Sequence, residues 1–179
     1  MVIIMKKYIW VLVLSILLVG CRSLSNVPTA KVEELLNKYQ TLDEQIVNEL
    51  NASLIDTNYT DEQKEKYKDI MKKQYNNLTY QIKEYKIDGN KATVTATITV
   101  KDFYRVLKDA DVYYEANREE FLENGNYISK FNDYRLELLE KAKEKVSYTI
   151  DFELTKENEW KVNTLSNEII DKISGVYAY

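Results

Sequence analysis

The chain has 179 residues, of which 45% are hydrophobic and 30% charged, and these proportions are typical of a folded globular protein rather than a disordered one. Its formal net charge is −4, with basic residues scattered among acidic ones, which disfavours binding to a nucleic-acid backbone. Histidine is absent, so catalytic triads that need histidine, His-ligated zinc and imidazole bases are excluded.

The first twenty residues have the layout of a secretory signal peptide. Lys6 and Lys7 precede an apolar stretch at residues 8–19. This stretch is too short to span a bilayer, which needs about twenty apolar residues. We therefore expect residues 1–20 to be removed, which leaves 23 basic and 29 acidic residues and a formal charge of −6.

The apolar stretch ends in Leu18-Val19-Gly20-Cys21, which resembles the lipobox of bacterial lipoproteins. In that family a Leu stands three places before the cysteine, a small or branched residue follows it, and Gly or Ala comes next. The resemblance implies cleavage between Gly20 and Cys21 and attachment of a diacylglyceryl group to the Cys21 thiol. The alternative is a buried cysteine at the end of an uncleaved anchor helix.

A lipid on Cys21 would hold the protein at the extracytoplasmic face of a bacterial cell membrane. Residues 21–29 are polar and irregular and hold the only proline, so we interpret them as a tether. Because Cys21 is the only cysteine, an internal disulfide is excluded, and the fold must depend on packing alone.

Two helices are predicted after the tether. Apolar residues recur at spacings of three and four over residues 32–54, which predicts one continuous helix with Thr29 as its N-cap. Thr60 and Gln63 match a capping box and begin a second helix, which ends near Asn76. The short polar link between the two predicts an antiparallel helical hairpin.

The period then changes to two, which is typical of β-strands. Apolar and polar residues alternate over residues 78–87, with one slip after Ile82. A tight-turn sequence at residues 88–90 leads into the clearest strand, residues 92–100, with aliphatic side chains on one face and threonines on the other.

The C-terminal half again has helices followed by strands. Residues 103–145 predict two charged, largely exposed helices, and residues 146–154 and 160–162 predict a second hairpin. Ser166 is the expected N-cap of a last short helix, and Gly175 suits its end.

The order of elements predicts an α+β fold in a single domain at residues 30–179. In it, an N-terminal helical hairpin packs on a curved antiparallel sheet of about four strands, with a helical pair inserted between the two β-hairpins. This order, with the W-x-V sequence of Trp160 and Val162, resembles the nuclear-transport-factor-2-like (cystatin-like) domain. The resemblance implies a curved sheet that wraps a long helix and leaves a conical pocket. The predicted order departs from the pattern of that family in two ways: it has fewer strands than is common there, and its inserted helices are larger.

Aromatic residues are the candidates for a binding site, since the chain holds 15 tyrosines. A concave pocket for a glycan, a peptide or an apolar small molecule could be lined by Tyr80, Tyr104, Tyr113, Tyr114, Tyr148 and Trp160. Alternatively, the same side chains fill the core between the sheet and the helices. No cofactor and no metal ion are predicted, because the Asp109-x-Asp111 pair lacks the glycine turn and the spaced glutamate of an EF-hand loop.

These features predict a membrane-anchored, non-catalytic binding domain at the cell envelope, with no nucleic-acid partner. One alternative is an interaction protein that docks on another envelope protein through the helices at residues 103–145. Another is an enzyme of the isomerase or dehydratase kind. It would use a carboxylate base and tyrosine donors from the set Asp102, Asp109, Asp111, Tyr80, Tyr104 and Tyr148, although solvated aspartates are the simpler interpretation.

Overall fold

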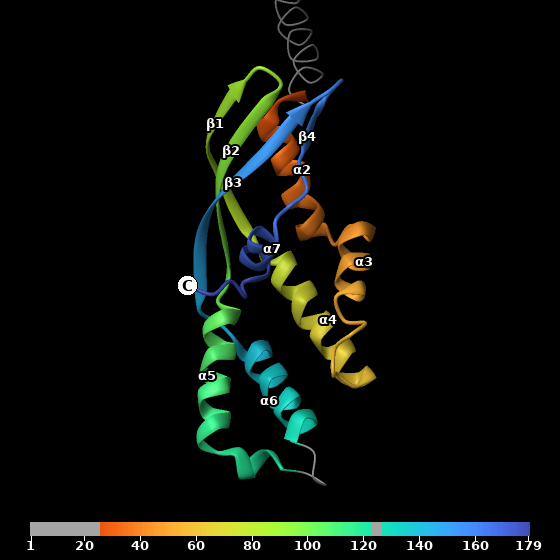
Figure 1. Ribbon diagram of the computed structural model, residues 1–179, viewed down its shortest axis with the longest axis vertical. Helices are drawn as coiled ribbons and strands as arrows, with labels where there is room; N and C mark the ends of the chain where they lie inside the picture. Colours follow the sequence, from red (N-terminus) through yellow and green to blue (C-terminus); the bar gives the residue numbers. More distant parts are fainter. Residues whose placement is uncertain (1–25, 123–126) are drawn as a thin grey trace, which may run out of the picture.

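The computed structural model of the protein describes residues 26–122 and 127–179. In this part of the chain, six α-helices and one antiparallel four-stranded sheet form an α+β fold, so the predicted fold class is confirmed (Figure 1). The elements in order are α2 (Pro28–Thr41), α3 (Glu44–Ala52), α4 (Asp61–Asn76), β1 (Thr79–Asp88), β2 (Lys91–Lys101), α5 (Phe103–Ala116), the 3₁₀ helix η2 (Arg118–Phe121), α6 (Tyr127–Lys141), β3 (Lys145–Lys156), β4 (Trp160–Val162) and α7 (Asn167–Ser174).

The N-terminal apolar stripe is divided between α2 and α3, so the prediction of one continuous helix to Leu54 is wrong. Leu42 adopts a left-handed backbone with φ of 55°. The N–H of Asp43 donates to the carbonyl oxygen of Lys38 at 2.9 Å and closes α2. Asp43 then caps α3 by accepting a hydrogen bond from the N–H of Gln45 at 3.0 Å. Apolar spacing continues on both sides of the bend, so periodicity alone does not reveal it.

Of the N-caps predicted for the first two helices, one is wrong and one is confirmed. Val27, not Thr29, is the N-cap of α2 and makes no side-chain hydrogen bond, and the helix begins at Pro28. Proline suits the first helical position because its missing N–H has no partner to lose there. The capping box of α4 is confirmed: Thr60 Oγ1 accepts from the N–H of Gln63 at 3.2 Å, and Gln63 Oε1 accepts from the N–H of Thr60 at 3.1 Å.

The sheet has the order β1-β2-β3-β4, and α5, η2 and α6 are inserted between β2 and β3 as predicted. The slip after Ile82 is a β-bulge, since Ile82 pairs with Ala96 whereas Glu84 pairs with Thr95. The two faces differ as the alternation predicts. Val94, opposite Phe152 on β3, is buried, while Thr95 on the other face donates to Asp151 Oδ1 at 2.6 Å.

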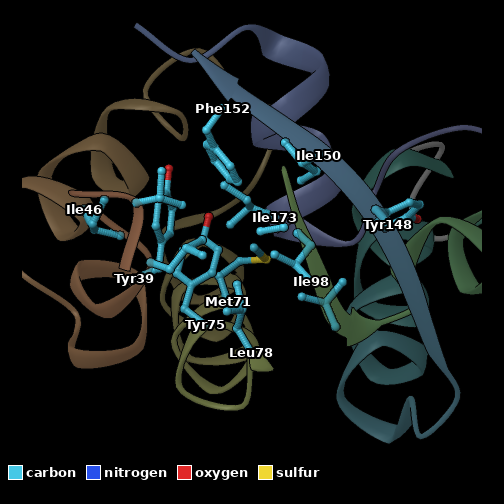
Figure 2. Close-up of a cluster of buried hydrophobic side chains, with 14 of the residues drawn as sticks. Tyr39, Ile46, Met71, Tyr75, Leu78, Ile98, Tyr148, Ile150, Phe152 and Ile173 are labelled. Atoms are coloured by element: carbon cyan, nitrogen blue, oxygen red, sulfur yellow. The ribbon is translucent and has the colours of Figure 1, made fainter. Parts of the chain in front are cut away.

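The core lies between the inner face of the sheet and helices α2, α3, α4 and α7. Figure 2 shows that side chains from all of these elements point into one interior, with Tyr39 and Tyr75 beside each other. Their ring centroids are 5.2 Å apart in an edge-to-face arrangement. Because this core draws on segments from α2 to α7, it unites the N-terminal helices and the sheet in one body.

Gln74, completely buried on α4, fastens the end of β2 to the end of α7. Its Nε2 donates to the carbonyl oxygens of Lys101 at 2.9 Å and Ser174 at 3.0 Å, and its Oε1 accepts from the N–H of Lys101 at 3.2 Å. Gly175 ends α7 with φ of 79°, and a Cβ there would lie 2.3 Å from the Lys101 oxygen. Both the left-handed backbone and the close approach therefore require glycine. The predicted caps of α7, Ser166 and Gly175, are confirmed.

The described part of the chain is elongated (Figure 1). The β1–β2 and β3–β4 turns and the start of α2 lie at one end, and α5 and α6 extend to the other. The N–H of Lys156 donates to the carbonyl oxygen of Asn90 at 2.8 Å and joins the two turns. None of the helices described is both long and apolar enough to cross a membrane.

Candidate functional site

A cleft of about 800 Å³ lies between the α3–α4 link, α4, and the helices α5 and α6. The link contributes its polar residues and Tyr59, and α4 contributes Tyr67. The inserted helices contribute a mostly apolar wall with one cation: Phe103, Leu107, Tyr114, Phe131, Asn132, Arg135 and Leu139. A cleft of this size and lining is suited to a small molecule.

Two aromatic pairs form the walls of the cleft. The rings of Tyr59 and Tyr67 lie 5.8 Å apart, and those of Tyr114 and Phe131 are stacked at 4.3 Å. Burial raises the pKa of Tyr67 and of Tyr59 above the ordinary tyrosine range, so both hydroxyls are neutral at physiological pH. The walls thus offer ring faces and neutral hydroxyl groups to a ligand.

Polar contacts fasten α6 across the cleft to the start of α4. Buried Gln63 donates from Nε2 to the carbonyl oxygen of Ser129 at 3.0 Å and to Asp133 Oδ1 at 2.8 Å. Asn132 Nδ2 donates to the carbonyl oxygen of Asn58 at 3.5 Å. These bonds join residues 66 to 74 positions apart in the sequence, so the cleft depends on the folded arrangement of the two regions.

Arg135 places a positive charge in the cleft. Its guanidinium carbon lies over the Phe131 ring, 5.6 Å from the centroid. Its Nε atom is buried and makes no hydrogen bond, and an oxygen of Asp111 lies 3.9 Å away, beyond hydrogen-bond range. Asp56 also lines the cleft and is exposed, so the lining carries both signs of charge.

The structure does not gather the six predicted aromatic residues around one pocket. Tyr114 lines the cleft, whereas Trp160 lines a separate hollow of about 560 Å³ beside α2, α3 and β4. Tyr113 is partly exposed and stacks on Tyr134 at 5.4 Å. Tyr80 is half-buried on β1 and donates to Asn37 Oδ1 at 3.3 Å.

The other two predicted residues, Tyr104 and Tyr148, lie beside the C-terminal tyrosines. Tyr148 packs against Tyr177 at 5.7 Å, and Tyr104 packs against Tyr179 at 5.3 Å. The buried Tyr148 hydroxyl has no hydrogen-bond partner, and burial, reinforced by the charge of Asp102, raises the pKa of Tyr148 to about 12. Figure 2 shows Tyr148 apart from the other labelled side chains of the core.

The three aspartates considered for an enzyme do not lie together in the cleft. Asp102 is buried as the N-cap of α5, where Oδ1 accepts from the N–H of Arg105 at 3.0 Å and Oδ2 accepts from the Tyr179 hydroxyl at 2.6 Å. Asp109 and Asp111 are exposed on α5. Within residues 26–122 and 127–179, no group of three or more acidic side chains is arranged to hold a metal ion.

Sequence reasoning missed the residues that build the cleft, namely Tyr59, Tyr67, Phe131 and Arg135. One signal was present: Arg135 occupies a position on the apolar stripe of α6, and a charged side chain at such a position suggests an interaction with a partner group or a ligand. The aromatic residues gave no such signal, since they fit an ordinary helix or link.

Comparison with protein families and with curated proteins finds no match. Among solved structures, the chain is similar to the crystal structure of a "putative lipoprotein" (ycdA) from Bacillus subtilis, with 13% sequence identity and a TM-score of 0.45. The similarity covers 88% of this chain and 51% of that chain, so this chain spans about half of that structure. Membership of the nuclear-transport-factor-2-like family stays a prediction. Gly20 and Cys21, with the predicted signal peptide and most of the tether, lie outside the described residues.

Proposed function

We propose that the protein is a bacterial lipoprotein, anchored through Cys21 at the extracytoplasmic face of the cell membrane, whose domain binds a small ligand without catalysing a reaction. The Leu18–Cys21 motif supports the anchor. The observation that carries the binding function is the cleft between α4 and the inserted helices, with stacked rings on its walls and a cation beside them.

The position of the first described residue suits such an anchor. Asn26 Oδ1 accepts a hydrogen bond from the N–H of Trp160 at 3.2 Å, beside the β3–β4 turn. A lipid on Cys21 would stand only five residues before Asn26, a distance of at most about 18 Å in an extended chain. The anchor would therefore bring the sheet end of the molecule close to the membrane. The inserted helices, at the opposite end in Figure 1, would point away from the membrane.

The anchor is tested in cells by replacing Cys21 with Ala. Labelling by a fatty-acid probe is expected to disappear, and uncleaved precursor to accumulate, because the thiol that receives the lipid is absent. Ser23→Ala is the matched control, since it changes a neighbouring residue outside the motif and leaves the thiol in place. Unchanged labelling of the Cys21→Ala protein would contradict the proposal.

The binding function is tested with 2-naphthamide, an uncharged aromatic probe. The full-length lipoprotein in detergent is titrated by calorimetry, and protein-free micelles are titrated in parallel to remove partitioning of the probe. Leu107→Trp fills the cleft and is expected to abolish saturable binding. Val112→Trp adds the same ring to the exposed side of α5 and is expected to leave binding unchanged. Absence of binding to the wild-type protein, or equal binding by the Leu107→Trp and Val112→Trp proteins, would contradict a ligand site in the cleft.

Exposed apolar side chains favour docking on another envelope protein as a second candidate function. Val112 is 66% exposed, Leu122 46% and Tyr113 40%, and all three belong to the inserted helical region. A photo-crosslinker at position 112 is expected to give one discrete adduct in cells that Leu122→Asp removes. A crosslinker at position 170, another exposed apolar site, is the control. A smear of adducts from both positions would contradict specific docking.

A further inference from the structure

We infer that Arg135 makes the cleft selective for aromatic ligands that carry an anionic oxygen group, a carboxylate or a phosphate. This inference rests on the proposed ligand site and adds the chemical class of the ligand. Three features of Arg135 lead to it: an unused hydrogen-bond donor, a weakly neutralised charge, and a ring beneath its face.

The first feature is the unused donor. A guanidinium carries five N–H donors, and a buried donor without a partner costs free energy. The Nε atom of Arg135 is fully shielded by protein and makes no hydrogen bond, and within the described residues no protein acceptor is found for its Nη groups either. A ligand cannot reach the shielded Nε, but the Nη groups are not buried and the side chain is 28% exposed, so a ligand oxygen can accept from their N–H donors.

The second feature is the charge. The ion pair nearest to Arg135 joins its Nε to Asp111 Oδ1 at 3.9 Å, and the Asp111 side chain is 59% exposed. Water screens a pair of this kind, so Asp111 neutralises the guanidinium only weakly. Asp56, which lines the cleft from the α3–α4 link, is exposed as well. A positive charge of the protein therefore remains available to an anion that enters.

The third feature is the ring arrangement around the cation. Phe131 lies under the Arg135 guanidinium and is itself stacked on Tyr114. Stacking occupies the face of a guanidinium, while its N–H donors lie in the plane and match the two oxygens of a carboxylate or phosphate. A flat aromatic body beside these rings would bring its attached anionic group to the N–H edge.

The inference is tested by comparing 2-naphthoate with uncharged 2-naphthamide on the full-length lipoprotein, by the same calorimetry. The wild-type protein is expected to bind 2-naphthoate about tenfold more tightly, as one hydrogen bond to a charged group allows. Arg135→Gln should bring the two affinities together while 2-naphthamide still binds, and Arg135→Lys should keep part of the preference. Lys141→Gln, which removes an exposed charge from the same helix, should leave the preference intact. A titration with 2-naphthyl phosphate shows which anion is preferred.

Two results separate failure of this inference from failure of the proposed function. If both probes bind to the wild-type protein with equal affinity, the anion selectivity is wrong and the ligand site stands. The same conclusion follows if the Arg135→Gln protein, shown to be folded by its unchanged melting temperature, keeps the tenfold preference. If neither probe binds to the wild-type protein, the ligand site itself is refuted, and the selectivity with it.

Discussion

Two regions of the molecule are stabilised in different ways. The body, made of the sheet with α2, α3, α4 and α7, has a core of aliphatic and aromatic side chains that every one of these elements helps to fill, and Phe103, Leu136 and Leu139 of the insert pack into it. The insert, made of α5, η2 and α6, depends at its far end on an aromatic cluster: Tyr113, Tyr114, Phe121, Phe131 and Tyr134.

The difference shows where the molecule can respond to a ligand. A core shared by many segments resists local opening, whereas a cluster held by two helices and a short turn can loosen alone. The candidate cleft lies where the insert meets the body, with Phe131 in both the cluster and the cleft wall. We therefore expect the insert to open before the body and a cleft ligand to oppose that opening.

The largest effect should come from the body core. Phe152 is completely buried on β3 opposite Val94, so Phe152→Ala leaves a large cavity under the helices. The free energy of unfolding should fall by about 3–5 kcal/mol. Urea unfolding followed by circular dichroism measures it. A loss below about 1 kcal/mol would show that the body core is not the main source of stability.

The next largest effect should come from Gln74, whose side chain joins the end of β2 to the end of α7. Gln74→Ala removes three hydrogen bonds to the backbone of Lys101 and Ser174, and the bond to Ser174 is buried, so we expect a loss of about 2–3 kcal/mol. Gln40→Ala is the matched control, because Gln40 makes one bond, to the carbonyl oxygen of Leu78, and is only half-buried. Equal melting temperatures for the two variants would show that the hydrogen bonds of Gln74 between β2 and α7 contribute no more stability than the single bond of Gln40.

Phe121→Ala probes the insert. Phe121 is buried among four rings, but they lie at the end of the molecule, where neighbours can relax into the space. We expect a loss of about 1–2 kcal/mol, less than for the same substitution at Phe152. Hydrogen exchange should accelerate in α5 and α6 and stay unchanged in β2 and β3. Acceleration throughout the sheet would mean that the insert and the body open together.

A smaller effect is expected from Tyr148→Phe, which removes a buried hydroxyl without a partner. At neutral pH the variant should equal or slightly exceed the wild-type stability. The raised pKa of Tyr148, about 12, means that the unfolded chain releases this proton from about pH 10 while the folded chain keeps it. Stability is therefore lost as pH rises from 10 to 12, and the variant should lose less. Tyrosinate absorbance followed with circular dichroism checks this; equal alkaline losses would contradict it.

The smallest effect should come from the exposed side of the insert. Val112→Ser changes a side chain that is largely in water, so the free energy of unfolding should move by less than about 0.5 kcal/mol. A larger loss, measured by the same urea unfolding, would show that Val112 packs in solution and is not available for docking.

Much of the local structure could be predicted because short-range patterns carry it. The alternating segment at residues 92–100 predicted a strand and its buried face, and the slip after Ile82 predicted the bulge. Thr60 with Gln63 predicted where α4 begins. Leu42 shows the limit of this reasoning. It takes a left-handed backbone that leucine rarely adopts, so no residue preference marks the end of α2.

Apart from the division of α2 from α3 and the start of α2, the amino-acid sequence alone determined the kinds of elements, their order and their buried faces, because caps and periodicity are set by residues a few positions apart. The lipid anchor stays a prediction, which rests on four consecutive residues ending at Cys21. The tertiary structure alone decided where the cleft lies and that the α3–α4 link meets α6 beside it. Those outcomes depend on contacts such as Asn58 with Asn132 and Gln74 with Ser174, which join residues 74 and 100 positions apart. Local patterns contain no information about which distant surfaces bury one another.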